Sequence, residues 1–185
     1  MANVNKFGQN MKIIEQTKHW ISSFVVKLGL CPFAEFPLQN DQIRYVVYEG
    51  ANLEDLIHLL DKELKLIQLS DPNEIETTLI IHPKVLNNFY DYNDFLDIAN
   101  QRIFALDLEG VLQIASFHPK YQFGGTEKDD VTNYTNRSPY PMLHILREQS
   151  IEIALEKYDN PEAIPENNID TMNKLGIEKI LKMIR

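Results

Sequence analysis

Apolar residues recur at helical spacing in three long segments of the chain. The segments cover residues 14–28, 53–67 and 92–106, and in each the apolar positions lie three or four residues apart. Gly29 follows the first segment at a place where helices often end in a left-handed residue. Asn52 precedes the second segment and is a favoured N-cap. The pattern predicts three amphipathic helices.

Shorter apolar segments between these helices have the composition of β-strands. Ile43–Tyr48 and Val111–Phe117 are rich in β-branched and aromatic residues. Thr77–His82 is almost continuously apolar, which is typical of a strand buried on both faces. Three strands are therefore expected, each separated from the next by a helix.

Two more helices are predicted in the last third of the chain. Ser138 is a favoured N-cap and Pro139 a favoured first helical residue, so a helix is expected from there to about Tyr158. An Asn- and Pro-rich connection follows. Apolar spacing then predicts a C-terminal helix over residues 170–184.

The alternation of strands and helices predicts the fold class. Strand–helix–strand units favour parallel pairing through right-handed crossovers. We expect residues 1–185 to form a single α/β domain, with a small, mainly parallel sheet of about three strands flanked by about five helices. The alternative is a split α+β sheet with an extra strand hidden in the loops.

Composition limits the possible partners and the compartment. The formal net charge of −9 argues against nucleic acid and anionic membranes, and no Lys/Arg cluster stands out before the last seven residues. No apolar segment approaches the ~20 residues of a membrane-spanning helix, and the N-terminus lacks the apolar core of a signal peptide. With a single cysteine, Cys31, a cytoplasmic location is expected. The sequence assigns neither a cofactor nor an oligomeric state.

The segment from His118 to Pro139 has no regular apolar pattern. It is longer than the roughly 12–15 residues beyond which structureless loops are uncommon unless they carry function. Its aromatic residues, among them Tyr121, Phe123 and Tyr134, argue against disorder. We therefore predict an ordered, functional loop.

Two histidines follow strands in the same local sequence. His82-Pro83 ends the second predicted strand and His118-Pro119 ends the third. If these strands are parallel, both imidazoles leave the sheet at its carboxyl edge, where open α/β sheets bind ligands. Histidine suits acid–base chemistry near neutral pH. The alternative is that each histidine only caps a strand end through a hydrogen bond.

The predicted helix beginning at Ser138 suggests an anion site. Free backbone amides at a helix N-terminus attract anions, and the adjacent Arg137 would strengthen such a site. In that helix Tyr140, His144 and Arg147 would share one face. An ordinary capped helix with a solvated polar side is the alternative.

Cys31 has two possible roles. It follows a predicted helix C-terminus, where the helix dipole disfavours a thiolate. A regular α/β layout would also place it at the sheet edge opposite the histidines, although the segment after it is long enough to double back. We expect a buried, slowly reacting thiol. A reactive thiol or a ligand to the site is the alternative.

Two motifs carry a family resemblance. Residues 28–34 (LGLCPFA) and the segment 117–148 resemble an uncharacterised bacterial family, catalogued as a domain of unknown function, number fourteen-fifteen. The similarity runs from Trp20 to about Leu155. It implies no activity or cofactor, but it marks the positions that match the family pattern: Cys31, Pro32, His118, Asn133, Asn136, Arg137, Ser138, Tyr140, His144, Arg147 and Glu148.

These observations support three hypotheses of function. The first is a small cytoplasmic enzyme or ligand-binding protein for an anionic small molecule. Arg137 and the helix amides would hold the anion and His118 would act as general acid–base, assisted by His82 or His144. The second is a mononuclear metal site built from the same three histidines. The third is a non-catalytic protein-interaction module.

Overall fold

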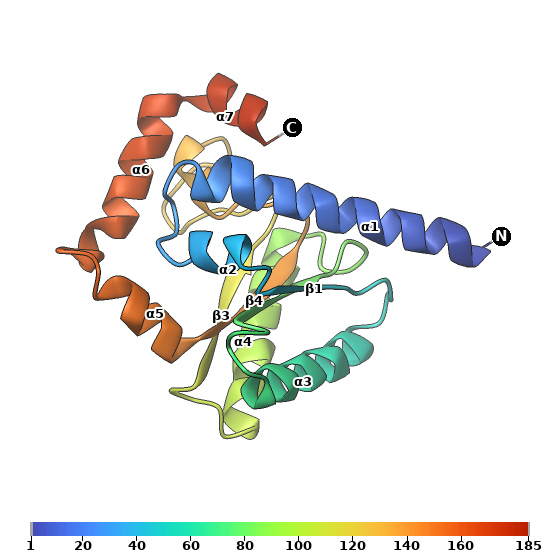
Figure 1. The fold of residues 1–185 in the computed structure, drawn as a ribbon. Helices are drawn as coiled ribbons and strands as arrows, with labels where there is room; N and C mark the ends of the chain where they lie inside the picture. Colours follow the sequence, from blue (N-terminus) through green and yellow to red (C-terminus); the bar gives the residue numbers. More distant parts are fainter. Residues whose placement is uncertain (1, 185) are drawn as a thin grey trace.

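A four-stranded mixed sheet forms the centre of the molecule, in a computed structural model that describes residues 2–184 (Figure 1). The strands are β1 (Ile43–Val47), β2 (Thr77–Ile81), β3 (Leu112–Phe117) and β4 (Met142–Arg147), in the spatial order β1-β2-β4-β3. β1 and β2 pair in parallel, and β4 runs antiparallel to both of its neighbours. The domain is α/β as predicted, but the sheet has four strands and is mixed.

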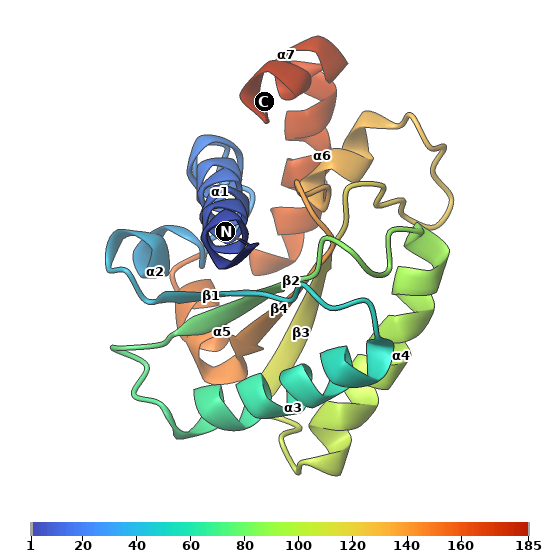
Figure 2. The same cartoon turned by 90° about the vertical axis from the view of Figure 1, so that its right-hand side faces the viewer.

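Helices cover both faces of this sheet (Figures 1 and 2). α3 (Leu53–Leu69) and α4 (Phe89–Ala105) cover one face. The other face carries α1 (Ala2–Trp20), which continues as the π-helical segment η1 (Ile21–Val26), and the short α2 (Glu35–Gln39). The remaining elements are η2 (Val131–Thr135), α5 (Glu148–Leu155), η3 (Pro161–Ala163), α6 (Ile164–Leu175) and α7 (Ile177–Met183).

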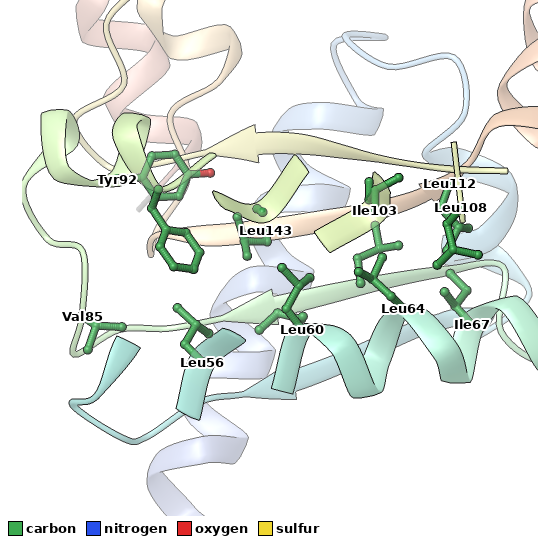
Figure 3. Close-up of a cluster of buried hydrophobic side chains, with 14 residues drawn as sticks. Leu56, Leu60, Leu64, Ile67, Val85, Tyr92, Ile103, Leu108, Leu112 and Leu143 are labelled. Carbon is green, nitrogen blue, oxygen red and sulfur yellow. The ribbon is translucent and has the colours of Figure 1, made fainter. Parts of the chain in front are cut away.

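The larger core lies between the sheet and the pair α3–α4 (Figure 3). Leu56, Leu60, Leu64 and Ile67 form the buried stripe of α3, at the spacing of one helix face. Asn52 caps this helix as predicted, because its side chain accepts a hydrogen bond from the Glu54 amide at 2.9 Å. Sequence periodicity and capping therefore agree on how α3 begins and which face it buries.

A second core occupies the opposite face of the sheet. Trp20 and Phe24 pack there against Leu79 of β2 and Met142 of β4. α6 and α7 complete this core with buried apolar side chains such as Met172. Because both faces of the sheet are covered, β2 is buried along its whole length, as its continuous apolar sequence predicts.

The predicted helix from Ser138 to Tyr158 is wrong. Residues 142–147 form β4, and helix begins only at Glu148. Along β4, Leu143 and Ile145 join the core under α3 and α4, while Met142 joins the core on the opposite face. An inner strand covered on both sides is apolar on both sides, and a short apolar segment of that kind also fits a helical stripe.

The predicted C-terminal helix over residues 170–184 is interrupted. Gly176 has φ +70° and separates α6 from α7. Gly29, with φ +64°, lies just beyond the first helical region, as predicted. At both places the chain turns through a conformation that glycine adopts without steric cost.

Arg147 lies at the amino edge of the sheet, far along β4 from the loop that contains Arg137. Its guanidinium donates hydrogen bonds to the carbonyl oxygens of Ile67, Ser70 and Ile75, at 2.6, 2.9 and 3.0 Å. Two of these carbonyls belong to the C-terminal end of α3, where backbone acceptors lack helical partners. Arg147 therefore caps α3, and it is not on a shared face with Tyr140 and His144.

Replacing Arg147 with Met should destabilise the fold, since three main-chain acceptors lose a charged donor. We expect the free energy of unfolding to fall by about 2–3 kcal/mol in urea titrations, with an unchanged m-value. Lys65→Met is the control, because Lys65 is exposed on α3 and forms no ion pair among the described residues. A loss no larger than that of the control would contradict the capping role.

Candidate functional site

Tyr92 organises the carboxyl edge of the sheet, where β1, β2 and β3 end. Its side chain is fully buried, and its hydroxyl lies between two strands. The hydroxyl donates to the Met142 carbonyl at 2.8 Å and accepts from the Phe117 amide at 3.0 Å. One phenol thus joins the start of β4 to the end of β3.

His82 and His118 emerge at the same edge, as predicted. β2 and β3 both run antiparallel to β4, so they share one direction. They are not neighbours, because β4 lies between them. The two imidazoles nevertheless pack on one side chain, with ring centroids 5.9 Å (His82) and 5.1 Å (His118) from that of Tyr92.

The His82 imidazole is buried and neutral. Its Nδ1 lies 3.2 Å from the Val85 carbonyl oxygen and donates to it. Its Nε2 is buried without a hydrogen-bond partner among the described residues. Burial, which penalises the charged form, lowers the pKa of His82 to about 4.

His118 has both ring nitrogens occupied by main-chain groups. Nδ1 accepts from the Lys120 amide at 2.9 Å, so Nε2 carries the proton and donates to the Leu86 carbonyl at 3.1 Å. The side chain is buried, and desolvation lowers its pKa. In this arrangement His118 joins the end of β3 to the segment that precedes α4.

Asn133 and Asn136 order the long loop. Asn133 is fully buried; its side-chain oxygen accepts from the Phe123 amide and from Thr126 Oγ1, both at 2.9 Å. The side chain of Asn136 donates to the Ser116 carbonyl at 3.1 Å. The loop from His118 to Pro139 is therefore ordered, as its aromatic content predicts.

Arg137 is held at the surface of this loop. Its Nε donates to the Tyr121 carbonyl at 3.1 Å, and one Nη donates to the Lys128 carbonyl. The guanidinium also stacks on Tyr134, 4.6 Å from the ring centroid. Main-chain acceptors and an aromatic ring thus fix its orientation.

No helix begins at Ser138, so the predicted anion site at such a helix N-terminus is wrong. The Ser138 hydroxyl donates to the Tyr140 carbonyl at 2.6 Å in place of capping a helix. The Tyr140 hydroxyl bonds to Gln16 of α1. The helix that begins at the carboxyl edge, next to Arg137, is α4, whose cap is Asn88.

A cleft of about 440 Å³ lies between the first turn of α4 and the loop. We call it the Arg137 cleft. Its lining residues are Asn88, Phe89, Tyr90, Pro119, Lys120, Gln122, Lys128 and Arg137. Three of them are cationic and none is acidic, in a chain whose net charge is −9.

His144 and Cys31 lie elsewhere, at a second and smaller cavity. Positions in β4 alternate between the two faces, and His144 faces the side covered by α1 and α2. It lines an apolar cavity of about 100 Å³ together with Cys31. Cys31 therefore shares a cavity with His144, and not with His82 or His118.

The Cys31 thiol has a raised pKa because burial disfavours the thiolate. The backbone amides of Phe33 and Ala34 oppose this shift to a smaller extent. The direction agrees with the reasoning behind a slow thiol, and the labelling rate stays a prediction.

The three histidines do not gather into one metal site. His82 and His118 pack on Tyr92, whereas His144 faces the other side of the sheet. Across the described part of the chain, no group of three or more His, Cys, Asp or Glu residues has the arrangement of a metal site. The mononuclear hypothesis therefore lacks its predicted ligand set.

Comparison with known proteins identifies the family. A family model described as "Protein of unknown function (DUF1415)" matches residues 12–182. The chain belongs to this family. No curated protein and no solved structure gives a significant match. Among helices of the described residues, none has the length and apolarity needed to cross a membrane.

Sequence reasoning missed several residues of the Arg137 cleft. Lys120, Gln122 and Lys128 come together only through the course of the loop, which no periodicity reveals. Asn88 carried a usable signal, because a favoured N-cap residue shortly after a buried strand marks a helix start at the carboxyl edge. The family description assigns no role to any of these residues.

Replacing Tyr92 with Phe should destabilise the protein although the aromatic ring is retained. The Phe117 amide and the Met142 carbonyl would lose their shared buried partner, which costs about 1–3 kcal/mol in the free energy of unfolding. Urea unfolding measures this loss. Tyr90→Phe, at an exposed ring of the same helix, is the control, and equal stability of the two variants would refute the bridging role.

The pH dependence of stability should report the neutral state of His82. The unfolded chain binds a proton near pH 6.5, while the folded chain does so only near pH 4. Between these values the unfolded state binds more protons, so stability falls as the pH decreases. The contribution is about 1.4 kcal/mol per pH unit. His82→Phe should have a shallower slope than the wild type between pH 6 and 5, and identical slopes would contradict the assignment.

Proposed function

We propose that this protein binds a small anionic molecule in the Arg137 cleft. The supporting observation is the local charge: Lys120, Lys128 and Arg137 surround one concave surface that has no carboxylate in its lining. In a chain with nine more acidic than basic residues, such a gathering favours an anionic ligand. The Arg137 cleft is not the site predicted at Ser138, but we propose the same class of ligand for it, a small anionic molecule.

The cations of the cleft have no acidic partner that would neutralise them. Across residues 2–184, neither lysine nor Arg137 forms an ion pair with a carboxylate. The Asp130 carboxylate accepts hydrogen bonds from the Thr132 amide and hydroxyl, and these lower the pKa of Asp130 most. Arg137 contributes only a minor electrostatic lowering of the same pKa. The three positive charges are therefore available to a ligand.

Arg137 is the best-oriented donor of the cleft. Because its Nε and one Nη already bond to main-chain carbonyls, the guanidinium keeps a fixed plane, and its other N–H groups have no acceptor among the described residues. A fixed guanidinium recognises planar carboxylates and phosphates through paired hydrogen bonds. The amino end of α4, which begins with Phe89 and Tyr90 in the same lining, adds its positive dipole.

The shape of the cleft indicates a metabolite-sized ligand. Its volume of about 440 Å³ falls within the ~300–1,000 Å³ typical of small-molecule sites. Phe89 and Tyr90 supply an aromatic wall, and Asn88 and Gln122 supply amide groups. We propose a phosphate or carboxylate group near Arg137, with the body of the ligand against the aromatic wall.

Proton transfer by His118 stays a prediction, and the proposal requires only binding. The ring nitrogens of His118 bond to the main chain of Leu86, in the segment before α4, and of Lys120, in the loop. We propose that His118 supports the cleft by joining the loop to the segment before α4. A role in acid–base chemistry would require one of these hydrogen bonds to break.

Inorganic phosphate and small carboxylates should raise the melting temperature of the wild type at constant ionic strength. Lys120→Gln and Lys128→Gln should each weaken phosphate binding about three- to tenfold, because each removes one charge from the cleft. Calorimetric titration gives the affinities. The double variant should bind more weakly than either single one.

Lys62→Gln is the matched control, because Lys62 is exposed on α3 and is not part of the cleft. It makes the same change in net charge and should leave phosphate affinity unchanged. An unshifted wild type would overturn the proposal. So would equal weakening by Lys62→Gln, or an Arg137→Ala variant with a thermal shift equal to that of the wild type.

A further inference from the structure

The smaller cavity on the other face of the sheet is a separate site, and nothing in the proposed function uses it. We call it the Cys31 cavity. It lies between the sheet and the segment that links η1 to α2, and its volume is about 100 Å³. Aliphatic and aromatic side chains such as Val25, Leu79 and Phe117 form its wall, and no Asp, Glu, Lys or Arg lines it.

Hydrogen bonding fixes the tautomer of His144 in this wall. The Thr77 hydroxyl has one proton, which it donates to the Ile145 carbonyl at 2.6 Å. Thr77 Oγ1 must therefore accept the second hydrogen bond, 2.7 Å from His144 Nε2, so Nε2 carries the ring proton. Nδ1 is left as a lone-pair acceptor without a partner among the described residues.

The polar side chains that line the cavity carry no charge. Burial lowers the pKa of His144 to about 4 and raises that of Cys31, so both side chains are neutral at physiological pH. The Trp20 indole N–H is buried without an acceptor in the described structure. A charged ligand would find no counter-charge here, and burying an unpaired charge is costly.

We propose that the Cys31 cavity binds a small, uncharged, mainly hydrocarbon molecule that donates one hydrogen bond to His144 Nδ1. The wall offers mainly apolar contact and one free acceptor. A short-chain alcohol has the matching chemistry: a hydroxyl donor on an aliphatic body.

The size of the cavity indicates a ligand of a few carbon atoms. An apolar cavity of about 150 Å³ accommodates benzene in other proteins, so about 100 Å³ suits a smaller group. A ligand of about five heavy atoms makes few contacts, so we expect weak binding, no tighter than about micromolar even at the ceiling of ligand efficiency.

The test compares 1-butanol with diethyl ether. These isomers have the same atoms, and only the alcohol can donate a hydrogen bond. The chain provides two intrinsic reporters, since Trp20 and Cys31 are its single tryptophan and single cysteine and both line the cavity. Trp20 fluorescence measures binding, and the rate of Cys31 alkylation by iodoacetamide measures protection.

With the wild type, 1-butanol should give a saturable change in fluorescence and slow the alkylation of Cys31. Diethyl ether should bind about fivefold or more weakly, the effect of one hydrogen bond. His144→Phe keeps an aromatic ring but removes the acceptor, so it should abolish the preference between the isomers. His58→Phe, at an exposed position of α3, should retain it.

Ala115→Leu provides an independent test, because Ala115 lines the cavity and a larger side chain would occupy it. This variant should lose the response to both isomers. Equal responses of the wild type to alcohol and ether would overturn the proposal. An unchanged response in Ala115→Leu, or stronger protection of Cys31 by butyrate or butylammonium than by 1-butanol, would also overturn it.

Discussion

The hydroxyl group of Tyr92 is the interaction on which the carboxyl edge of this domain depends. It lies in an otherwise apolar core, bonded to Met142 of β4 and Phe117 of β3. A buried hydroxyl without a partner is costly, and here its pairing fixes the ends of two strands. His82 and His118 pack on the same ring, so the start of the long loop is placed relative to the start of α4. The Arg137 cleft lies between these two segments.

β4 lies between β2 and β3, and its polar residues reach different parts of the molecule. Successive residues of a strand face opposite sides of the sheet. Leu143 and Ile145 therefore enter the core under α3 and α4, while His144 faces the Cys31 cavity. Arg147, at the far end of the strand, caps α3. Residues that seem to form one cluster in the sequence thus serve three different parts of the molecule.

Much of the fold could be predicted from the sequence, because local signals and tertiary packing agree there. The α3 stripe, the Asn52 cap, the glycine at position 29 and the shared edge of His82 and His118 are such cases. β4 was missed because an inner strand is apolar on both faces, and Ser138-Pro139 imitates a helix start. The Arg137 cleft was missed in part because Lys120 and Lys128 meet only after Asn133 has ordered the loop.

The central claim is that the Arg137 cleft is an anion site, and mapping amide chemical shifts during a titration with inorganic phosphate tests it most directly. The account predicts saturable shifts for the amides of residues 88–90 and of Lys120, Gln122, Lys128 and Arg137, which line the cleft. It also predicts that the amides of the Cys31 cavity, on the other face of the sheet, remain unchanged. Shifts that do not saturate, or that concentrate at surfaces away from the cleft, would contradict the account.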